Sequence, residues 1–315
     1  MNRNTLAALS LTAALSLSLA ACGSGTTGTA ETPAAPESTT PAAQTTTPAE
    51  TETAAIASGV EDGVLTVGME CAYAPYNWTQ MDDSNGAVPI SNVSGAYANG
   101  YDVMIAQRIC EANGWELEVV STAWDSLIPA LQSGTIDVAI AGQSMTADRM
   151  AQVDMAGPYY YADIVCLTTA GSEYASAQSI ADLAGGRGTA QSGTIWYDTC
   201  LPQIPDVQIQ TAAETAPAMV MQLQTGAVDF VCTDLPTATA AAANDPNLVV
   251  LNFAGTDGDF QFATEEERAE NVNIGMSVVK GNTVLLDAMN AVLGEMTTDD
   301  FNALMEEAIS VQPEV

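Results

Sequence analysis

Apolar residues between positions 64 and 141 recur in short runs, and these runs follow two different periods. A short continuous apolar run is typical of a buried strand, whereas apolar residues three and four positions apart are typical of an amphipathic helix. We therefore predict strands over residues 64–68, 117–120 and 136–141 and helices over residues 101–113 and 127–132. This alternation is typical of an α/β fold with parallel strands and helices on both faces of the sheet.

A nine-residue pattern occurs twice in the chain. Residues 131–139 read LQSGTIDVA and residues 223–231 read LQTGAVDFV, which gives four identical positions. Each copy predicts a helix end, a turn at glycine and a buried strand, although a similarity this short can also arise by chance. If the repeat is structural, the chain has two similar α/β lobes, and the loops over residues 142–146 and 233–236 follow equivalent strands. Ligands of open α/β sheets bind at such strand ends, so the two loops would form a cleft.

Two polar segments lack both periods. Residues 23–59 consist largely of Thr, Ala, Pro, Glu and Ser and contain no aromatic residue. Such a composition cannot bury enough apolar surface to fold, so we expect a disordered tether that reaches on the order of 35 Å. Residues 80–98, rich in Gly, Asn, Asp and Ser, predict a loop or insertion.

The N-terminus predicts export. Arg3 precedes an apolar run over residues 6–20, which has the length of a signal-peptide core and is too short to span a bilayer comfortably. The run ends in Leu-Ala-Ala followed by Cys22, which resembles the lipobox at which bacterial lipoproteins are cleaved and diacylated. We expect residues 1–21 to be a lipoprotein signal peptide and lipid on Cys22 to be the only membrane anchor; an ordinary secretory signal is the alternative.

Charge and composition exclude several classes of function. The chain has 6 basic and 39 acidic residues and no histidine. A net charge of −33 repels nucleic acid. Without histidine, Ser-His-Asp, Cys-His and His-metal sites cannot form. Five cysteines remain besides Cys22, but they are widely spaced and form no CxxC motif, so we predict no metal or cofactor and assign no disulfide.

The loop after the first repeat is suited to a carboxylate. Ser144 or Thr146 can cap the helix that follows, and Arg149 supplies a planar two-pronged donor. The alternative is an ordinary cap beside a surface arginine. Because basic residues are so scarce in this chain, we favour a ligand-binding role.

The loop after the second repeat carries the opposite charge. Asp234 stands where the first repeat has Gly142, and Pro236 follows it. Asp234 could simply cap the next helix. Facing Arg149 across a cleft, it would instead complete a site for a zwitterion with a carboxylate and an ammonium on one carbon.

Aromatic residues follow two of the predicted strands. Tyr73 and Trp78 lie shortly after the first strand, and Trp124 directly precedes the second helix. Aromatic rings at strand ends can flank a ligand, although they are more often part of the core.

Together these motifs resemble the amino-acid-binding solute-binding proteins of family 3, which have the type II periplasmic-binding-protein fold. The resemblance covers residues 60–315, and its motifs occur in order at family-like intervals. They lie at residues 70–78, 100–102, 124–142, 145–149, 157–160 and 191–194.

The resemblance implies a role for each candidate residue. Arg149 would hold the ligand α-carboxylate with Ser144, backbone amides near Gly142 and, from the second lobe, Thr194. Asp234 would bind the α-ammonium, Tyr73 and Trp124 would be aromatic walls, and Glu70 and Gln191 would line the side-chain region. The sequence departs from the family at Ala141, Gly142 and Ile195, where some members place serine or threonine.

The resemblance also implies the domain organisation and the mechanism. Lobe 1 would comprise residues 60–163 plus 272–315, and lobe 2 residues 164–271. A monomer would capture a free amino acid by hinge closure and present it to an ABC permease and its ATPase.

The identity of the ligand stays open. Glu70 and the acidic composition favour a cationic amino acid such as arginine, lysine, ornithine or histidine, and glutamine or cystine is the alternative. We predict that the chain is not an enzyme. An adhesin or sensor on the same fold is the first rival, and a cyclohexadienyl-dehydratase-like enzyme that uses Glu70 as an acid is the second.

Overall fold

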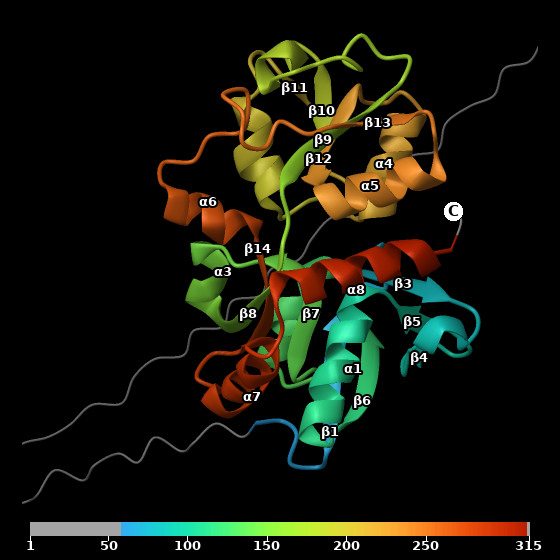
Figure 1. The fold of residues 1–315 in the computed structure, drawn as a ribbon, viewed down its shortest axis with the longest axis vertical. Helices are drawn as coiled ribbons and strands as arrows, with labels where there is room; N and C mark the ends of the chain where they lie inside the picture. The colour runs from blue at the N-terminus through green and yellow to red at the C-terminus, as the bar shows by residue number, and fades with distance from the viewer. Residues whose placement is uncertain (1–57, 314–315) are drawn as a thin grey trace, which may run out of the picture. The chain divides into compact units, whose positions relative to one another are not determined.

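The computed structural model describes residues 58–313 of the 315-residue chain. The predicted signal peptide, Cys22 and nearly all of the predicted tether lie outside the described residues. The described part contains two five-stranded sheets and one small four-stranded sheet (Figure 1). Within it, no helix combines the length and the apolar character that crossing a membrane requires.

The first five-stranded sheet has the order β6-β1-β7-β14-β8. Its strands are β6 (Glu116–Ser121), β1 (Val64–Met69), β7 (Val138–Ser144), β14 (Asn273–Val279) and β8 (Val153–Tyr161). β1 is parallel to β6 and β7, whereas β14 is antiparallel to both of its neighbours. Helices α1 (Tyr101–Asn113), α2 (Leu127–Gln132), α7 (Thr283–Leu293) and α8 (Thr298–Val311) contact this sheet or one another, and α3 (Ala147–Gln152) follows β7.

The second five-stranded sheet has the order β11-β10-β12-β9-β13. Its strands are β11 (Gln208–Ile209), β10 (Arg187–Thr189), β12 (Phe230–Asp234), β9 (Ile164–Thr169) and β13 (Leu248–Leu251). β9 is antiparallel to β12 and β13. Helices α4 (Ala216–Gln224) and α5 (Leu235–Asn244) pack on this sheet, and α6 (Glu265–Val272) leads back to the first sheet. The segments η3 (Ile180–Leu183), η4 (Trp196–Cys200) and η5 (Leu201–Gln203) connect its strands.

The α/β fold is confirmed, but the expectation of parallel strands was wrong for one strand in each sheet, β14 and β9. The chain leaves the first sheet after β8 and enters the second as β9, and it returns through α6 into β14. Each entering strand runs against its neighbours because it comes from the other lobe. The two crossing segments lie side by side, since the amide of Ala162 donates to the carbonyl of Val272 at 2.8 Å.

Short strands occupy part of the predicted loop over residues 80–98 and of the segment just before it. β2 (Ala72–Tyr73), β3 (Asn77–Gln80), β5 (Tyr97–Asn99) and β4 (Val88–Pro89) pair in that order, and η1 (Ser84–Gly86) links β3 to β4. Two to four residues are too few to display a period in the sequence, so the pattern could not reveal them.

The internal repeat is confirmed by the backbone. Gly134 and Gly226 have φ angles of 71° and 73°, which is the left-handed region that glycine adopts without strain. Asp137 accepts the amide of Thr66 at 2.9 Å, and Asp229 accepts the amide of Arg187 at 2.8 Å. In both lobes the repeat aspartate thus ties the helix-to-strand turn to the neighbouring strand.

Candidate functional site

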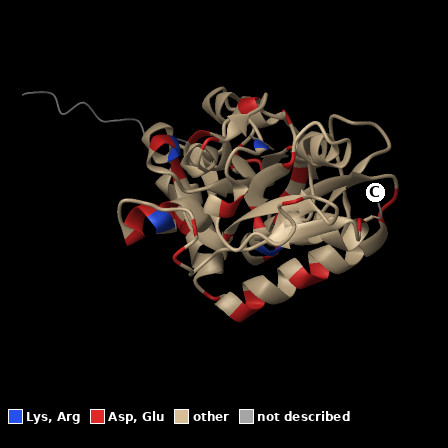
Figure 2. Ribbon diagram, turned by 90° about the horizontal axis from the view of Figure 1, so that it is seen from above, with Lys and Arg blue, Asp and Glu red and all other residues tan. Residues whose placement is uncertain are grey.

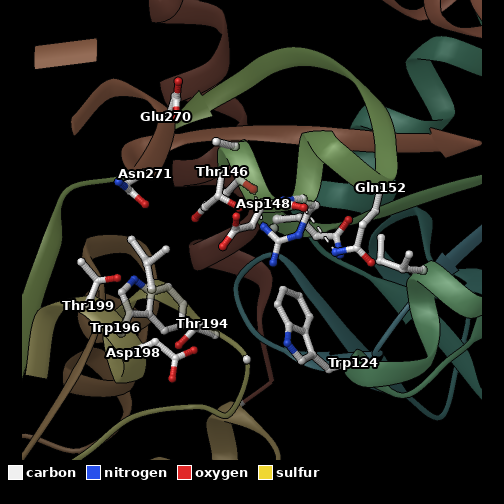
Figure 3. A pocket seen from close by; sticks show the side chains of 18 of the residues that line it. Trp124, Thr146, Asp148, Gln152, Thr194, Trp196, Asp198, Thr199, Glu270 and Asn271 are labelled. Carbon is white, nitrogen blue, oxygen red and sulfur yellow. Dashed lines mark hydrogen bonds between the residues drawn. The ribbon is translucent and has the colours of Figure 1, made fainter. Parts of the chain in front are cut away.

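A cavity of about 660 Å³ lies between loops of the two sheets. From the first sheet it is lined by the end of β7, by α3 and by the 3-10 helix η2 (Trp124–Ser126), which leads into α2. From the second sheet it is lined by residues 193–199, and α6 contributes three further residues. Figure 3 shows Trp124, Asp148, Thr194 and Asp198 around this space.

Arg149 is the positively charged residue of the cavity lining. Thr146 caps α3 by accepting the amide of Arg149 at 3.3 Å, which fixes the arginine in the first turn of the helix. The guanidinium lies 5.4 Å from the centroid of the Trp124 ring and donates to the carbonyl of Ser144. Burial lowers the pKa of Arg149 to about 10, so the group remains charged at neutral pH.

No carboxylate neutralises this charge in the described part of the chain. Its three ion pairs join Arg187 to Asp229, Arg268 to Asp259 and Lys280 to Asp154. A half-buried guanidinium whose partners are one carbonyl and one indole face retains donors for a bidentate carboxylate.

Four of the nine candidate residues lie behind the cavity rather than in its lining. Glu70, Tyr73, Gln191 and Asp234 are each at most 8% exposed, and we call them the buried polar layer. The Nε2 of Gln191 donates to the carboxylate of Glu70 at 3.2 Å, and the hydroxyl of Tyr73 donates to Asp234. Both contacts join a segment that precedes β9 to a segment that follows it, and so connect the two lobes.

Asp234 also caps a helix, as the simpler interpretation of its sequence context expected. Its Oδ1 accepts the amide of Thr237 at 2.8 Å at the start of α5. Burial raises the pKa of the Asp234 carboxyl, and the hydrogen bonds from Tyr73 and Thr237 act in the opposite direction. Within the described residues, the buried hydroxyls of Tyr76, Thr233 and Thr237 have no hydrogen-bond partner. Thr233 directly precedes Asp234, Thr237 donates its backbone amide to Asp234, and the Tyr76 ring stacks on Tyr73 at 4.9 Å.

Glu70 is a second buried carboxyl. Burial raises its pKa to about 7, an effect that the hydrogen bond from Gln191 partly offsets. Glu70 therefore keeps its proton to a higher pH than an exposed glutamate does.

A family model described as bacterial extracellular solute-binding proteins, family 3, matches residues 65–309. The chain belongs to this family. The match confirms the resemblance that the sequence motifs indicated, and the two lobes are those of the type II periplasmic-binding-protein fold.

Relatives of this chain are named as amino-acid-binding proteins. The probable histidine-binding protein of Campylobacter jejuni is 29% identical over 255 residues, which cover 80% of this chain and 87% of that protein. The L-cystine-binding protein TcyJ of Escherichia coli strain K12 is 26% identical over 239 residues, which cover 76% and 79%. An amino acid ABC transporter substrate-binding protein from Streptococcus pneumoniae, solved with L-arginine, has a TM-score of 0.67 and 25% identity over 81% of this chain and 96% of that one.

The departure from family 3 at Gly142 has a steric reason. Gly142 has a φ of +62°, and a Cβ at this position would lie 2.6 Å from Cε1 of Tyr73. Because Gly142 has no side chain, the Tyr73 ring can pack against it while the Tyr73 hydroxyl donates to Asp234. The Gly142 amide donates to the hydroxyl of Tyr159 at 3.0 Å, so this amide is already engaged.

The hydroxyl of Thr194 is also engaged. It donates to the carbonyl of Gln191 at 2.7 Å, which leaves its oxygen as an acceptor facing the cavity lining. Ser144 is the last residue of β7, is 9% exposed, and contributes its carbonyl to Arg149. Five of the nine candidates thus line the cavity: Trp124, Gly142, Ser144, Arg149 and Thr194.

Sequence reasoning assigned no role to Asp102. This carboxylate in the first turn of α1 accepts hydrogen bonds from the Tyr159 hydroxyl at 2.7 Å and from the side-chain Nδ2 of Asn77 at 2.8 Å. Since the Gly142 amide donates to the same Tyr159 hydroxyl, Asp102 supports the Gly142 loop. Burial raises its pKa to about 7. An aspartate directly after the Gly100-Tyr101 pair was the available signal, but such a residue usually marks only the start of a helix.

The sequence analysis also did not predict that the cavity lining is acidic. Asp125, Asp148, Asp198, Glu267 and Glu270 line the cavity, five carboxylates against the single guanidinium of Arg149. Figure 2 shows acidic residues throughout the described part of the chain and few basic ones. The residues come from four separate segments, so only the fold brings them together. Among residues 58–313, no group of acidic or cysteine side chains has the arrangement of a metal site.

Proposed function

We propose that this protein captures a free α-amino acid with a cationic side chain outside the cytoplasm and delivers it to an ABC importer. The observation that carries the proposal is a charged Arg149 with no carboxylate partner among the described residues, in a cavity lined by five carboxylates. The arginine suits the ligand carboxylate, and the acidic lining suits the cationic end of the same ligand.

The ammonium of the ligand would bind at Asp234. Gly142 lines the cavity, Tyr73 packs against Gly142, and the Tyr73 hydroxyl donates to Asp234. We propose that the ligand replaces the hydrogen bond from Tyr73 to Asp234 with one from its own ammonium. The Tyr76 and Thr237 hydroxyls, which have no partner within residues 58–313, would supply further acceptors.

Delivery would depend on hinge closure. The two crossing segments are the only covalent connections between the sheets in the described residues, and the lobe boundaries that we propose, 163/164 and 271/272, fall in these segments. We further propose that lipid on Cys22 holds the monomeric protein at the extracytoplasmic face of the membrane, with residues 23–59 as its tether.

A thermal-shift screen tests the proposal. The full chain is heated with each of the twenty standard amino acids and with ornithine, citrulline and cystine. We expect arginine, lysine, ornithine or histidine to stabilise the fold most, by about 4 kcal/mol at a thousandfold excess over the dissociation constant. Stabilisation by glutamine or cystine alone would retain the amino-acid site and overturn its charge preference. No shift with any of these compounds would overturn the proposal itself.

The rival functions make different predictions. A dehydratase would need Glu70 to reach a substrate, but Glu70 is bonded to Gln191 behind the cavity lining, which favours binding over catalysis. Turnover of prephenate or arogenate would favour the enzyme. An adhesin or sensor would lack genetic linkage to a permease and an ATPase.

A further inference from the structure

Three thiols lie together in the core of the second lobe. Cys166 lies in β9, Cys232 in β12 and Cys200 at the end of η4, and all three are fully buried. Burial raises the pKa of the Cys200 thiol, and the neighbouring Cys166 contributes to this rise. The binding site uses none of them.

Cys166 and Cys232 face each other directly. Strands β9 and β12 are antiparallel, and their register pairs Cys166 with Cys232, between the flanking pairs Leu167–Val231 and Val165–Thr233. The two Sγ atoms are 3.4 Å apart. Opposite residues of antiparallel strands have Cα atoms about 4.5–5.5 Å apart, within the range that a disulfide spans, so the bond needs side-chain rotation rather than backbone movement.

The compartment favours oxidation of this pair. Family 3 consists of extracellular proteins, and disulfides persist outside the reducing cytoplasm. In the folded protein, burial raises the pKa of the Cys232 thiol, which suppresses the reactive thiolate. Oxidation would therefore occur while the chain folds after export, and the finished bond would be out of reach of external thiols.

We infer that the exported protein carries a disulfide between Cys166 and Cys232. The chemistry is two successive thiol–disulfide exchanges with a small or protein disulfide as oxidant. The first cysteine thiolate attacks the oxidant and releases one thiol, and the second attacks the mixed disulfide and releases the other. The cysteine pair loses two electrons and two protons, and the oxidant becomes two thiols.

The position of the bond gives it a structural role. Cys166 is two residues after Ile164, where the chain enters the second sheet, and Cys232 is two residues before Asp234. The disulfide would fasten the strand that enters from the hinge to the strand that carries Asp234.

Peptide mapping of the exported full chain tests the inference. The chain is denatured in the presence of an alkylating reagent and digested with trypsin, which cuts after Arg149, Arg187 and Arg268. Cys166 is the single cysteine of the fragment 150–187, whereas the fragment 188–268 contains both Cys200 and Cys232. We expect these two fragments to appear as one linked species that reductant separates.

The variant Cys200→Ser identifies the partner. In this variant Cys232 is the single cysteine of fragment 188–268, so a linked species can contain only the Cys166–Cys232 bond. We expect the link to persist in Cys200→Ser and to disappear in Cys232→Ser. Separate fragments with alkylated Cys166 and Cys232 in the wild type, or loss of the link in Cys200→Ser, would overturn the inference. The wild type and Cys200→Ser decide the question even if Cys232→Ser does not fold.

Discussion

At the scale of single residues, the site depends on how a charged group is held without a charged partner. Burying a guanidinium costs free energy unless other groups replace its hydration. Arg149 has the Ser144 carbonyl and the Trp124 ring for this purpose. Both hold the guanidinium in place without neutralising it, so the charge remains available to a ligand.

Removing this charge tests its assigned role. We expect Arg149→Ala to weaken binding of every amino acid by about 2–5 kcal/mol, the usual cost of leaving one member of a buried charge pair alone. Isothermal titration calorimetry measures the effect. The matched control is Arg108→Ala, since Arg108 is an exposed arginine of α1. Unchanged affinity in Arg149→Ala would contradict the assignment.

The buried carboxyls predict a pH dependence of stability. The pKa of Glu70 in the folded protein is about 7, above the ordinary value of 4.5, so the folded protein holds a proton that the unfolded chain releases in this window. The free energy of unfolding should therefore fall as pH rises from about 4.5 to 7, by on the order of 1–3 kcal/mol for this residue.

Urea unfolding of the wild type and of Glu70→Gln across this window measures the effect. We expect a shallower fall in the variant, and Asp102, whose pKa is also raised to about 7, accounts for a remaining slope. The same slope in both proteins would show that Glu70 does not titrate as described.

The sequence predicted part of the site. The internal repeat identified the loop that leads to Arg149 and the loop that carries Asp234, because ligands gather at strand ends, whereas Thr194 followed only from the resemblance to family 3. The sequence could not show that the Tyr73 hydroxyl donates a hydrogen bond to Asp234, or that the Gly142 amide donates one to the Tyr159 hydroxyl. Each of these contacts joins segments that are separate in the chain.

At the scale of elements, each lobe uses one aspartate to hold its repeat turn. Asp137 and Asp229 occupy the same position of the two repeats and accept a backbone amide from the neighbouring parallel strand, β1 or β10. The sequence identity of the repeat therefore reflects a backbone requirement rather than ligand contact.

Asp137 offers a test of this role. Asp137→Ala leaves the Thr66 amide without its partner and should lower the free energy of unfolding by about 1–3 kcal/mol. Asp137→Asn retains an acceptor oxygen and should lose less. Urea unfolding compares the two variants, and equal losses would rule out the hydrogen bond as the cause.

The reliability of sequence prediction differs between elements for physical reasons. The helices α1 and α2 were predicted with their exact bounds, and α1 has 13 residues, enough for its apolar positions to display a period. The direction of β9 and β14 was not predictable, because it follows from the two crossings between lobes and leaves no local pattern.

At the scale of the whole molecule, charge should govern how the ligand arrives. The chain has a net charge of −33, and the cavity lining carries the same sign. Such a field attracts cations over distances that salt shortens to about 10 Å at 0.1 M.

The association rate of a cationic amino acid should therefore fall by about tenfold between low and high salt. Stopped-flow fluorescence can follow it, since Trp124 and Trp196 line the cavity. A neutral amino acid serves as the control and should bind at a rate that salt hardly changes. Equal salt dependence for both ligands would argue against electrostatic attraction.

The pairing of β8 with β14 has a consequence for how the molecule is assembled. Tyr161 at the end of β8 is directly opposite Asn273 at the start of β14, as in the last pair of a β-hairpin. The 111 residues between these two positions occupy the place of the hairpin turn. The second lobe is thus an insertion at the turn of a β-hairpin formed by β8 and β14. If a short turn replaced it, every strand of the first sheet would keep its present neighbours.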